Sequence, residues 1–111
     1  MVRRFLLVLA IATTSCATGG YEILSGTKTP TASVGSAVML YGVDTTTVPP
    51  PGCRTLGTIR AWSFGEKTFP YDQLRAAASE LGGDSVLDIH ADPSATDPKR
   101  PTSIGTVARC N

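Results

Sequence analysis

The three cysteines of this 111-residue chain constrain its fold and its compartment more than any other feature. Cys16 follows an apolar N-terminal run, whereas Cys53 and Cys110 lie far apart in the remaining sequence. Removal of a leader leaves Cys53 and Cys110 to pair, and an even number of cysteines in an oxidising compartment is typical of one disulfide. A Cys53–Cys110 bond would stabilise a small domain by about 4 kcal/mol. Two buried free thiols are the alternative. One histidine and no Cys-x-x-Cys pair disfavour a zinc site, so no metal ligands are predicted.

Residues 1–15 have the layout of a signal peptide of the lipoprotein type. Arg3 and Arg4 form a short basic region, and the apolar run from Phe5 is well short of the roughly 20 residues that span a bilayer. The small residues that lead into Cys16 resemble a bacterial lipobox, with Thr13 where leucine is usual. The resemblance implies that the Cys16 thiol carries an acyl chain such as palmitate and that this residue becomes the new N-terminus.

A second cleavage site overlaps the first. Ser15-Cys16-Ala17 also fits the small-x-small rule of ordinary signal peptidase, which would remove the cysteine and release a soluble periplasmic or secreted protein. Ala17 stands where inner-membrane lipoproteins commonly carry Asp, so similarity to Gram-negative sorting rules implies an outer-membrane address. We expect a lipid-anchored outer-membrane protein that faces the periplasm, with the soluble protein as the alternative.

The size and charge of the chain limit its domain count and its partners. Without the leader, roughly 95 residues remain, which is enough for one small domain. A formal charge of +1 leaves no basic surface for nucleic acid. The expected partners are the membrane, through the lipid anchor, and another protein of the envelope. The sequence does not predict an oligomeric state.

Residues 16–35 are predicted to be the lipidated cysteine and a flexible tether, and residues 36–111 the folded domain. The tether segment is rich in Gly, Thr and Ser, a composition typical of flexible linkers. Only Tyr21 to Leu24 is apolar, and a short edge strand is the alternative interpretation of those residues.

The domain is predicted to be an α+β fold with the order β-β-α-β-β. Runs rich in β-branched residues predict strands over 37–43, 53–62, 85–91 and 102–110. One helix on a mainly antiparallel sheet follows, with a disulfide joining the second strand to the fourth. The second and fourth strands carry Leu56-Gly57-Thr58-Ile59 and Ile104-Gly105-Thr106-Val107. This similarity suggests neighbouring strands whose glycines make room for bulky partners.

The helix between the second and third predicted strands has the clearest periodicity. Pro70 suits its first turn, Asp72 suits its positive end, and Gly82-Gly83 supplies a left-handed stop. The apolar positions recur at three- and four-residue steps and form one stripe, which comprises Tyr71, Leu74, Ala77, Ala78 and Leu81. In the strand that follows, simple alternation predicts two sets of residues on opposite faces, Leu87, Ile89 and Ala91 on one and Val86, Asp88 and His90 on the other.

These segments together resemble the small bacterial lipoprotein domain typified by the RcsF family. The similarity rests on the strand Cys53-Arg-Thr-Leu-Gly-Thr-Ile59, the helix and turn that begin Leu74-Arg-Ala-Ala-Ala-Ser-Glu-Leu-Gly-Gly, and the final strand Gly105-Thr-Val-Ala-Arg-Cys110. It implies an outer-membrane lipoprotein whose periplasmic sensor or interaction domain is held by disulfide bonding. The protein that typifies the family has a second disulfide, and this chain lacks that second pair of cysteines.

No residue pattern in the chain indicates catalysis or a cofactor. His90 and Asp88 alternate on one strand and are expected on a solvated sheet face, and Asp72 and Glu80 are too far apart along the helix to act as a pair. Four aromatic residues surround the strand-to-helix loop and are expected to close the core rather than form an exposed partner patch: Trp62, Phe64, Phe69 and Tyr71. We therefore expect a non-enzymatic envelope lipoprotein that acts as an interaction or stress-sensing module. The alternative is a structural or small-ligand-binding envelope protein without a signalling role.

Overall fold

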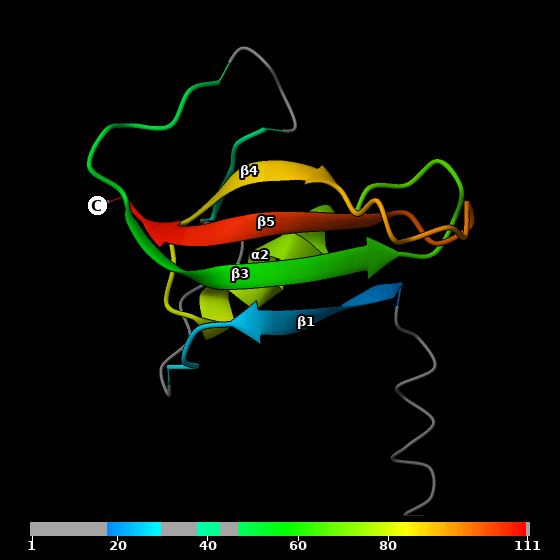
Figure 1. The fold of residues 1–111 in the computed structure, drawn as a ribbon, viewed down its shortest axis with the longest axis horizontal. Helices are drawn as coiled ribbons and strands as arrows, with labels where there is room; N and C mark the ends of the chain where they lie inside the picture. The colour runs from blue at the N-terminus through cyan, green and yellow to red at the C-terminus, as the bar shows by residue number, and fades with distance from the viewer. Residues whose placement is uncertain (1–17, 30–37, 43–46, 111) are drawn as a thin grey trace, which may run out of the picture.

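The computed structural model describes residues 18–29, 38–42 and 47–110. They form one five-stranded sheet in the order β1-β3-β5-β4-β2, with helix α2 packed on one of its faces (Figure 1). The elements are β1 (Gly19–Ser25), β2 (Met39–Leu40), β3 (Arg54–Ser63), α2 (Tyr71–Glu80), β4 (Ser85–Ala91) and β5 (Thr102–Arg109). The predicted α+β class, with one helix on a mainly antiparallel sheet and one disulfide, is confirmed.

The sheet is antiparallel except at one edge. β3 pairs antiparallel with β1 and β5, and β4 pairs antiparallel with β5, whereas β2 lies parallel to β4. Within the predicted strand 37–43, the described residues pair only at Met39–Leu40. Gly42 then turns the chain with a φ of 107°. Such a backbone conformation is open to glycine and strained for other residues, so the pairing ends there.

The tether prediction is wrong for residues 19–25, which form edge strand β1. Gly19 pairs with Ser63 at one end of the strand, and Ser25 pairs with Thr58 at the other. Tyr21 and Ile23 pack against the hydrophobic core, and the Tyr21 hydroxyl donates a hydrogen bond to the Glu80 carboxylate of α2. Long-range pairing with β3 therefore stabilises a segment whose own composition is typical of a linker.

The central pair of strands confirms the prediction drawn from their similar sequences. β3 and β5 are antiparallel neighbours, with Gly57 opposite Val107 and Ile59 opposite Gly105. A Cβ at position 57 would lie 2.1 Å from the Ser25 carbonyl oxygen. Glycine is therefore required for β1 to approach β3 at that position.

The apolar stripe of α2 forms one side of the core. Leu74, Ala77 and Ala78 are fully buried, and Leu81 is nearly so. The helix ends as predicted, because Gly82 has a φ of 75° and the amide of Gly83 donates to the Ala78 carbonyl at 3.0 Å. Tyr71 departs from the predicted stripe, because it lies in the first turn and is 45% exposed.

Simple alternation fails in β4 because the strand contains a bulge. Leu87 pairs with Thr106 and His90 with Ile104, so three steps along β4 match two along β5. Asp88 takes a φ of 54° within this bulge. As a result Val86 and Ile89, which were predicted on opposite faces, are both buried in the core.

Candidate functional site

The Cys53–Cys110 disulfide forms as predicted. It joins the start of β3 to the end of β5, with 4.1 Å between the two Cα atoms and 57 residues between the cysteines. The Asp84 carboxylate accepts a hydrogen bond of 2.8 Å from the Cys110 amide, which fixes the end of β5 to the turn after α2. These contacts hold the two strand ends together.

The sheet face opposite α2 carries the most distinctive side chains of the molecule. We call it the open face, because within the described residues no other helix or strand packs on it (Figure 1). Ile59 and Ala61 of β3 point to α2 and are buried, so the alternating residues Arg60 and Trp62 point to the open face. Cross-strand registers place further residues on the same face, namely Glu22, Thr58, Leu87, His90, Thr102, Ile104 and Thr106.

Arg60 lies between two carboxylates on this face. Its Nη1 atom is 2.7 Å from Oε1 of Glu22 on β1, and its Nε atom is 3.0 Å from Oδ2 of Asp92 after β4. The Asp92 side chain is only 5% exposed, whereas that of Glu22 is 50% exposed. Arg60 thus connects edge strand β1 to the segment that follows β4, on the other side of β5. Of its two ion pairs, the one with the buried Asp92 is the one that water screens least.

Asp92 is held as a carboxylate by the turn that it begins. Its Oδ1 atom accepts hydrogen bonds from the amide of Ser94 at 2.9 Å and from the hydroxyl of Ser94 at 2.8 Å. These two bonds and the nearby Arg60 guanidinium lower the pKa of Asp92 below its ordinary value, against the opposing effect of burial. The start of the 92–101 loop is therefore ordered by a charged, fully engaged side chain.

Arg100 occupies the other side of the same loop. Its guanidinium carbon lies 4.5 Å from the centre of the Trp62 ring, which is a cation–π geometry. The Asp97 carbonyl accepts a bond of 3.1 Å from the Arg100 amide, and its carboxylate accepts one of 3.0 Å from the Lys99 amide. The open face thus presents an aromatic ring covered by an arginine, next to a second arginine bound to acids.

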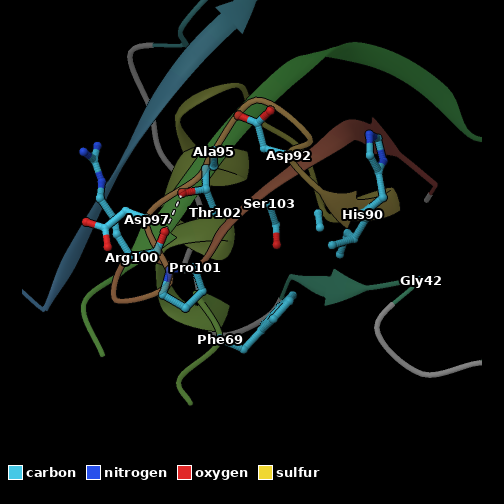
Figure 2. A pocket seen from close by; sticks show the side chains of 12 residues that line it. Gly42, Phe69, His90, Asp92, Ala95, Asp97, Arg100, Pro101, Thr102 and Ser103 are labelled. Carbon is cyan, nitrogen blue, oxygen red and sulfur yellow. Dashed lines mark hydrogen bonds between the residues drawn. The ribbon is translucent and has the colours of Figure 1, made fainter. Parts of the chain in front are cut away.

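Two hollows lie on either side of the 92–101 loop. The one on the open face has a volume of about 310 Å³ and is bordered by Glu22, Arg60, Trp62 and Arg100. The other has a volume of about 570 Å³ and is lined by Phe69, Ile89, Pro101 and Ser103 among others. Figure 2 shows His90 and Asp92 pointing away from Phe69 and the Ser103 hydroxyl directed toward it, and Asp97, Arg100 and Thr102 also border this second hollow.

His90 lies where the sequence predicted, on an exposed position of the sheet. Its Nδ1 atom is 2.8 Å from the backbone carbonyl oxygen of Asp88, a contact within its own strand. Within residues 18–29, 38–42 and 47–110, no three His, Cys, Asp or Glu side chains gather closely enough to hold a metal ion. Asp72 and Glu80 lie at opposite ends of α2, and Glu80 instead pairs with Lys28 at 3.3 Å.

The aromatic residues around the β3–α2 connection divide into two groups. Phe69 packs against the core, as predicted, and its ring centre lies 4.7 Å from that of Tyr71. Phe64 and Tyr71 do not close the core, because they are 54% and 45% exposed. The prediction of core closure is wrong for these two residues and also for Trp62, which points to the open face.

The Arg60 bridge and the Arg100–Trp62 contact were not predicted from the sequence. The alternation of Ile59, Arg60, Ala61 and Trp62 contained a usable signal, since it places the arginine and the tryptophan on one face. The order Asp92-Pro93-Ser94 contained another, because an Asp two residues before a Ser is typical of a turn in which the carboxylate accepts the later amide. Neither signal identifies Glu22 as a partner.

Comparisons with known proteins identify no relative of the chain. No protein-family model, no curated protein and no solved structure matches it. The leader 1–15, Cys16 and Ala17 lie outside the described residues. In the part of the chain that the structure describes, no helix combines the length and the apolar character needed to cross a bilayer.

Proposed function

We propose that this protein is a non-enzymatic lipoprotein of the cell envelope that acts as an interaction or stress-sensing module. In this proposal Cys16 carries the lipid, and the domain faces the periplasm from the outer membrane. The leader sequence and the similarity to RcsF-like domains support the anchor. The Cys53–Cys110 disulfide is consistent with it, because such bonds persist in oxidising compartments outside the cytosol.

The observation that carries the interaction role is the arrangement of Arg60, Trp62 and Arg100 on the open face. Tryptophan and arginine are the residue types that most often dominate binding energy at protein interfaces. Both arginines are already held, one by carboxylates and one over the indole ring. A partner that docks here would therefore restrict few further rotamers, which favours binding.

The anchor is tested by metabolic labelling with palmitate. The wild-type protein should take up the label, and Cys16→Ala should not. Cys53→Ser/Cys110→Ser serves as the matched control, because it removes two cysteines and leaves the proposed lipobox intact. A label that survives Cys16→Ala contradicts the anchor, and mature protein that begins after Cys16 supports the soluble alternative.

The interaction role is tested by photo-crosslinking in intact cells. A photoreactive amino acid at Thr106 lies on the open face, whereas one at Asp72, whose side chain is 96% exposed, lies on α2. We expect one discrete adduct with another envelope protein from position 106 and none from position 72. The role is contradicted by adducts that are equal at both positions, or by none at position 106 under resting and envelope-stress conditions.

The hollow beside Phe69 favours a second candidate, the binding of a small apolar ligand. Its volume of about 570 Å³ lies within the range of known ligand sites, and its lining combines apolar residues such as Phe69 and Ile89 with polar ones that include Arg100, Thr102 and Ser103. The fluorescent probe anilinonaphthalene sulfonate should bind the native protein, and Ala95→Trp should displace it, since Ala95 is exposed at the border of the hollow. A native protein that does not bind the probe contradicts this candidate.

A further inference from the structure

The distance in sequence between the proposed anchor and the first strand is very short. β1 begins at Gly19, and Thr18 is already in contact with the domain, because its carbonyl accepts a hydrogen bond of 2.9 Å from the Phe64 amide. Cys16 precedes Thr18 by two residues, and consecutive Cα atoms are 3.8 Å apart, so the two Cα atoms are separated by about 7.6 Å at most. An acylated Cys16 would leave this end of the domain no room to stand away from the bilayer.

The surface around Thr18 has the side chains expected of a membrane contact. Phe64, which adjoins Thr18, is 54% exposed, and nearby Tyr71 is 45% exposed. Together with Thr18 and Phe69 they border an open hollow of about 600 Å³. Aromatic side chains are favoured at the boundary between lipid headgroups and acyl chains, which gives an energetic reason for Phe64 and Tyr71 to remain unburied in the domain itself.

The charges at this end nearly cancel. Lys67 belongs to the 64–70 turn, and the carbonyl of Lys99 accepts a bond of 2.8 Å from the Gly65 amide, which places Lys99 beside that turn. Glu66 in the turn and Asp72 in the first turn of α2 offset these two lysines, and Arg75, which borders the same hollow and lies 3.9 Å from Asp72, leaves one positive charge in excess. The surface therefore fits zwitterionic phospholipid headgroups, and attraction to anionic lipids should contribute little.

We propose that the domain stands directly on the phospholipid surface, with Thr18, Phe64 and Tyr71 at the contact. This inference rests on the proposed lipidation of Cys16. β1 begins at the contact and the antiparallel β3 ends at it, so the long axes of both strands extend away from the membrane (Figure 1). The Cys53–Cys110 disulfide then lies at the far end, and the open face remains accessible from the side.

Fluorescence quenching by spin-labelled lipid tests the orientation. The full chain, produced with its lipid, carries the fluorescent amino acid acridonylalanine at position 64 or at position 54. It is inserted into phosphatidylethanolamine-rich vesicles whose headgroups carry nitroxide labels. We expect about two-fold or stronger quenching at position 64 and almost none at position 54, because the length of β3 separates the two by roughly 30 Å. Quenching at position 64 should not change with salt.

A spacer variant separates the orientation from the anchor. Insertion of about twenty Gly and Ser residues after Ala17 adds a flexible linker of about 25 Å, so the quenching at position 64 should be lost while palmitate labelling persists. Labelled wild-type protein with equal or no quenching at the two positions overturns the proposed orientation and leaves the anchor standing. Wild-type protein that takes up no palmitate overturns both.

Discussion

Gly105 on β5 approaches Val86 on β4 so closely that a Cβ at position 105 would lie 2.5 Å from Cγ1 of Val86. The valine is fully buried, and the same added atom would lie 3.4 Å from Cγ1 of Ile89. The bulge in β4 causes this crowding, since Val86 pairs with the nearby Val107 while Ile89, in the bulge opposite Gly105, also turns toward the core. The missing side chain of Gly105 is what allows the bulge to pack.

Gly105→Ala should therefore lower the free energy of unfolding by about 1–3 kcal/mol through overpacking. Val86→Ala alone should also destabilise the protein, because it leaves a cavity. In the double variant the new methyl group occupies space that Val86 has vacated, so the loss should be smaller than the sum of the two single losses by about 1 kcal/mol. Urea unfolding measures all three variants, and strictly additive losses would show that the contact is not the cause.

The disulfide should contribute much of the stability of the domain. Its loop spans 57 residues, for which the chain-entropy model gives about 4 kcal/mol at 25 °C. Cys53→Ser/Cys110→Ser should lose about that free energy of unfolding, and the wild-type domain in reductant should behave like this variant. Cys16→Ser is the matched control and should unfold like the wild type. Equal stability with and without reductant would contradict the prediction, as would free thiols at both positions in material isolated from the periplasm.

The elements that were predicted well are those with local signals. The stripe of α2, its glycine stop and the bounds of the strand at 85–91 all follow from periodicity and turn chemistry within a few residues. β1 has only a weak local signal, the apolar run Tyr21 to Leu24 that allowed an edge strand as the alternative, because its stability comes from pairing with the distant strand β3. Local composition alone favoured a tether there.

The candidate site was less predictable than the fold for a related reason. The Arg60 bridge requires the register of β1 against β3 and the position of Asp92 after the bulged strand β4. Alternation along β4 misplaced its residues because a single bulge at Asp88 exchanges the two faces. Pairings of this kind are decided by tertiary packing, so a single sequence does not reveal which charged residues meet.

The lowered pKa of Asp92 predicts a definite dependence of stability on pH. A carboxyl group whose pKa is lower in the folded than in the unfolded protein stabilises the fold above its unfolded pKa and loses that effect as the pH falls through the folded pKa. The contribution of Asp92 should thus be constant near neutral pH and should decline below about pH 4. Thermal unfolding across this range measures it.

Two variants separate the causes of that decline. Asp92→Asn cannot titrate, so its unfolding curve should show a shallower loss of stability in acid than the wild type. Ser94→Ala removes the hydroxyl that donates at 2.8 Å and keeps the amide donor, so the pKa of Asp92 should move part of the way toward its ordinary value in carboxyl-carbon NMR titrations. A loss of stability in acid that is identical in the wild type and in Asp92→Asn would contradict the prediction.

Two buried serines with equal exposure should respond in opposite ways to replacement by alanine. Ser63 and Ser79 are each 5% exposed. The Ser63 hydroxyl lies 2.9 Å from that of Thr68, whereas the Ser79 hydroxyl is buried without a hydrogen-bond partner among the described residues. Ser63→Ala breaks a bond and should lose about 1 kcal/mol. Ser79→Ala removes an unsatisfied polar atom from a helix and should gain about 1 kcal/mol. Urea unfolding of the two variants provides the comparison, and a loss at Ser79 equal to that at Ser63 would show that its hydroxyl has a partner after all.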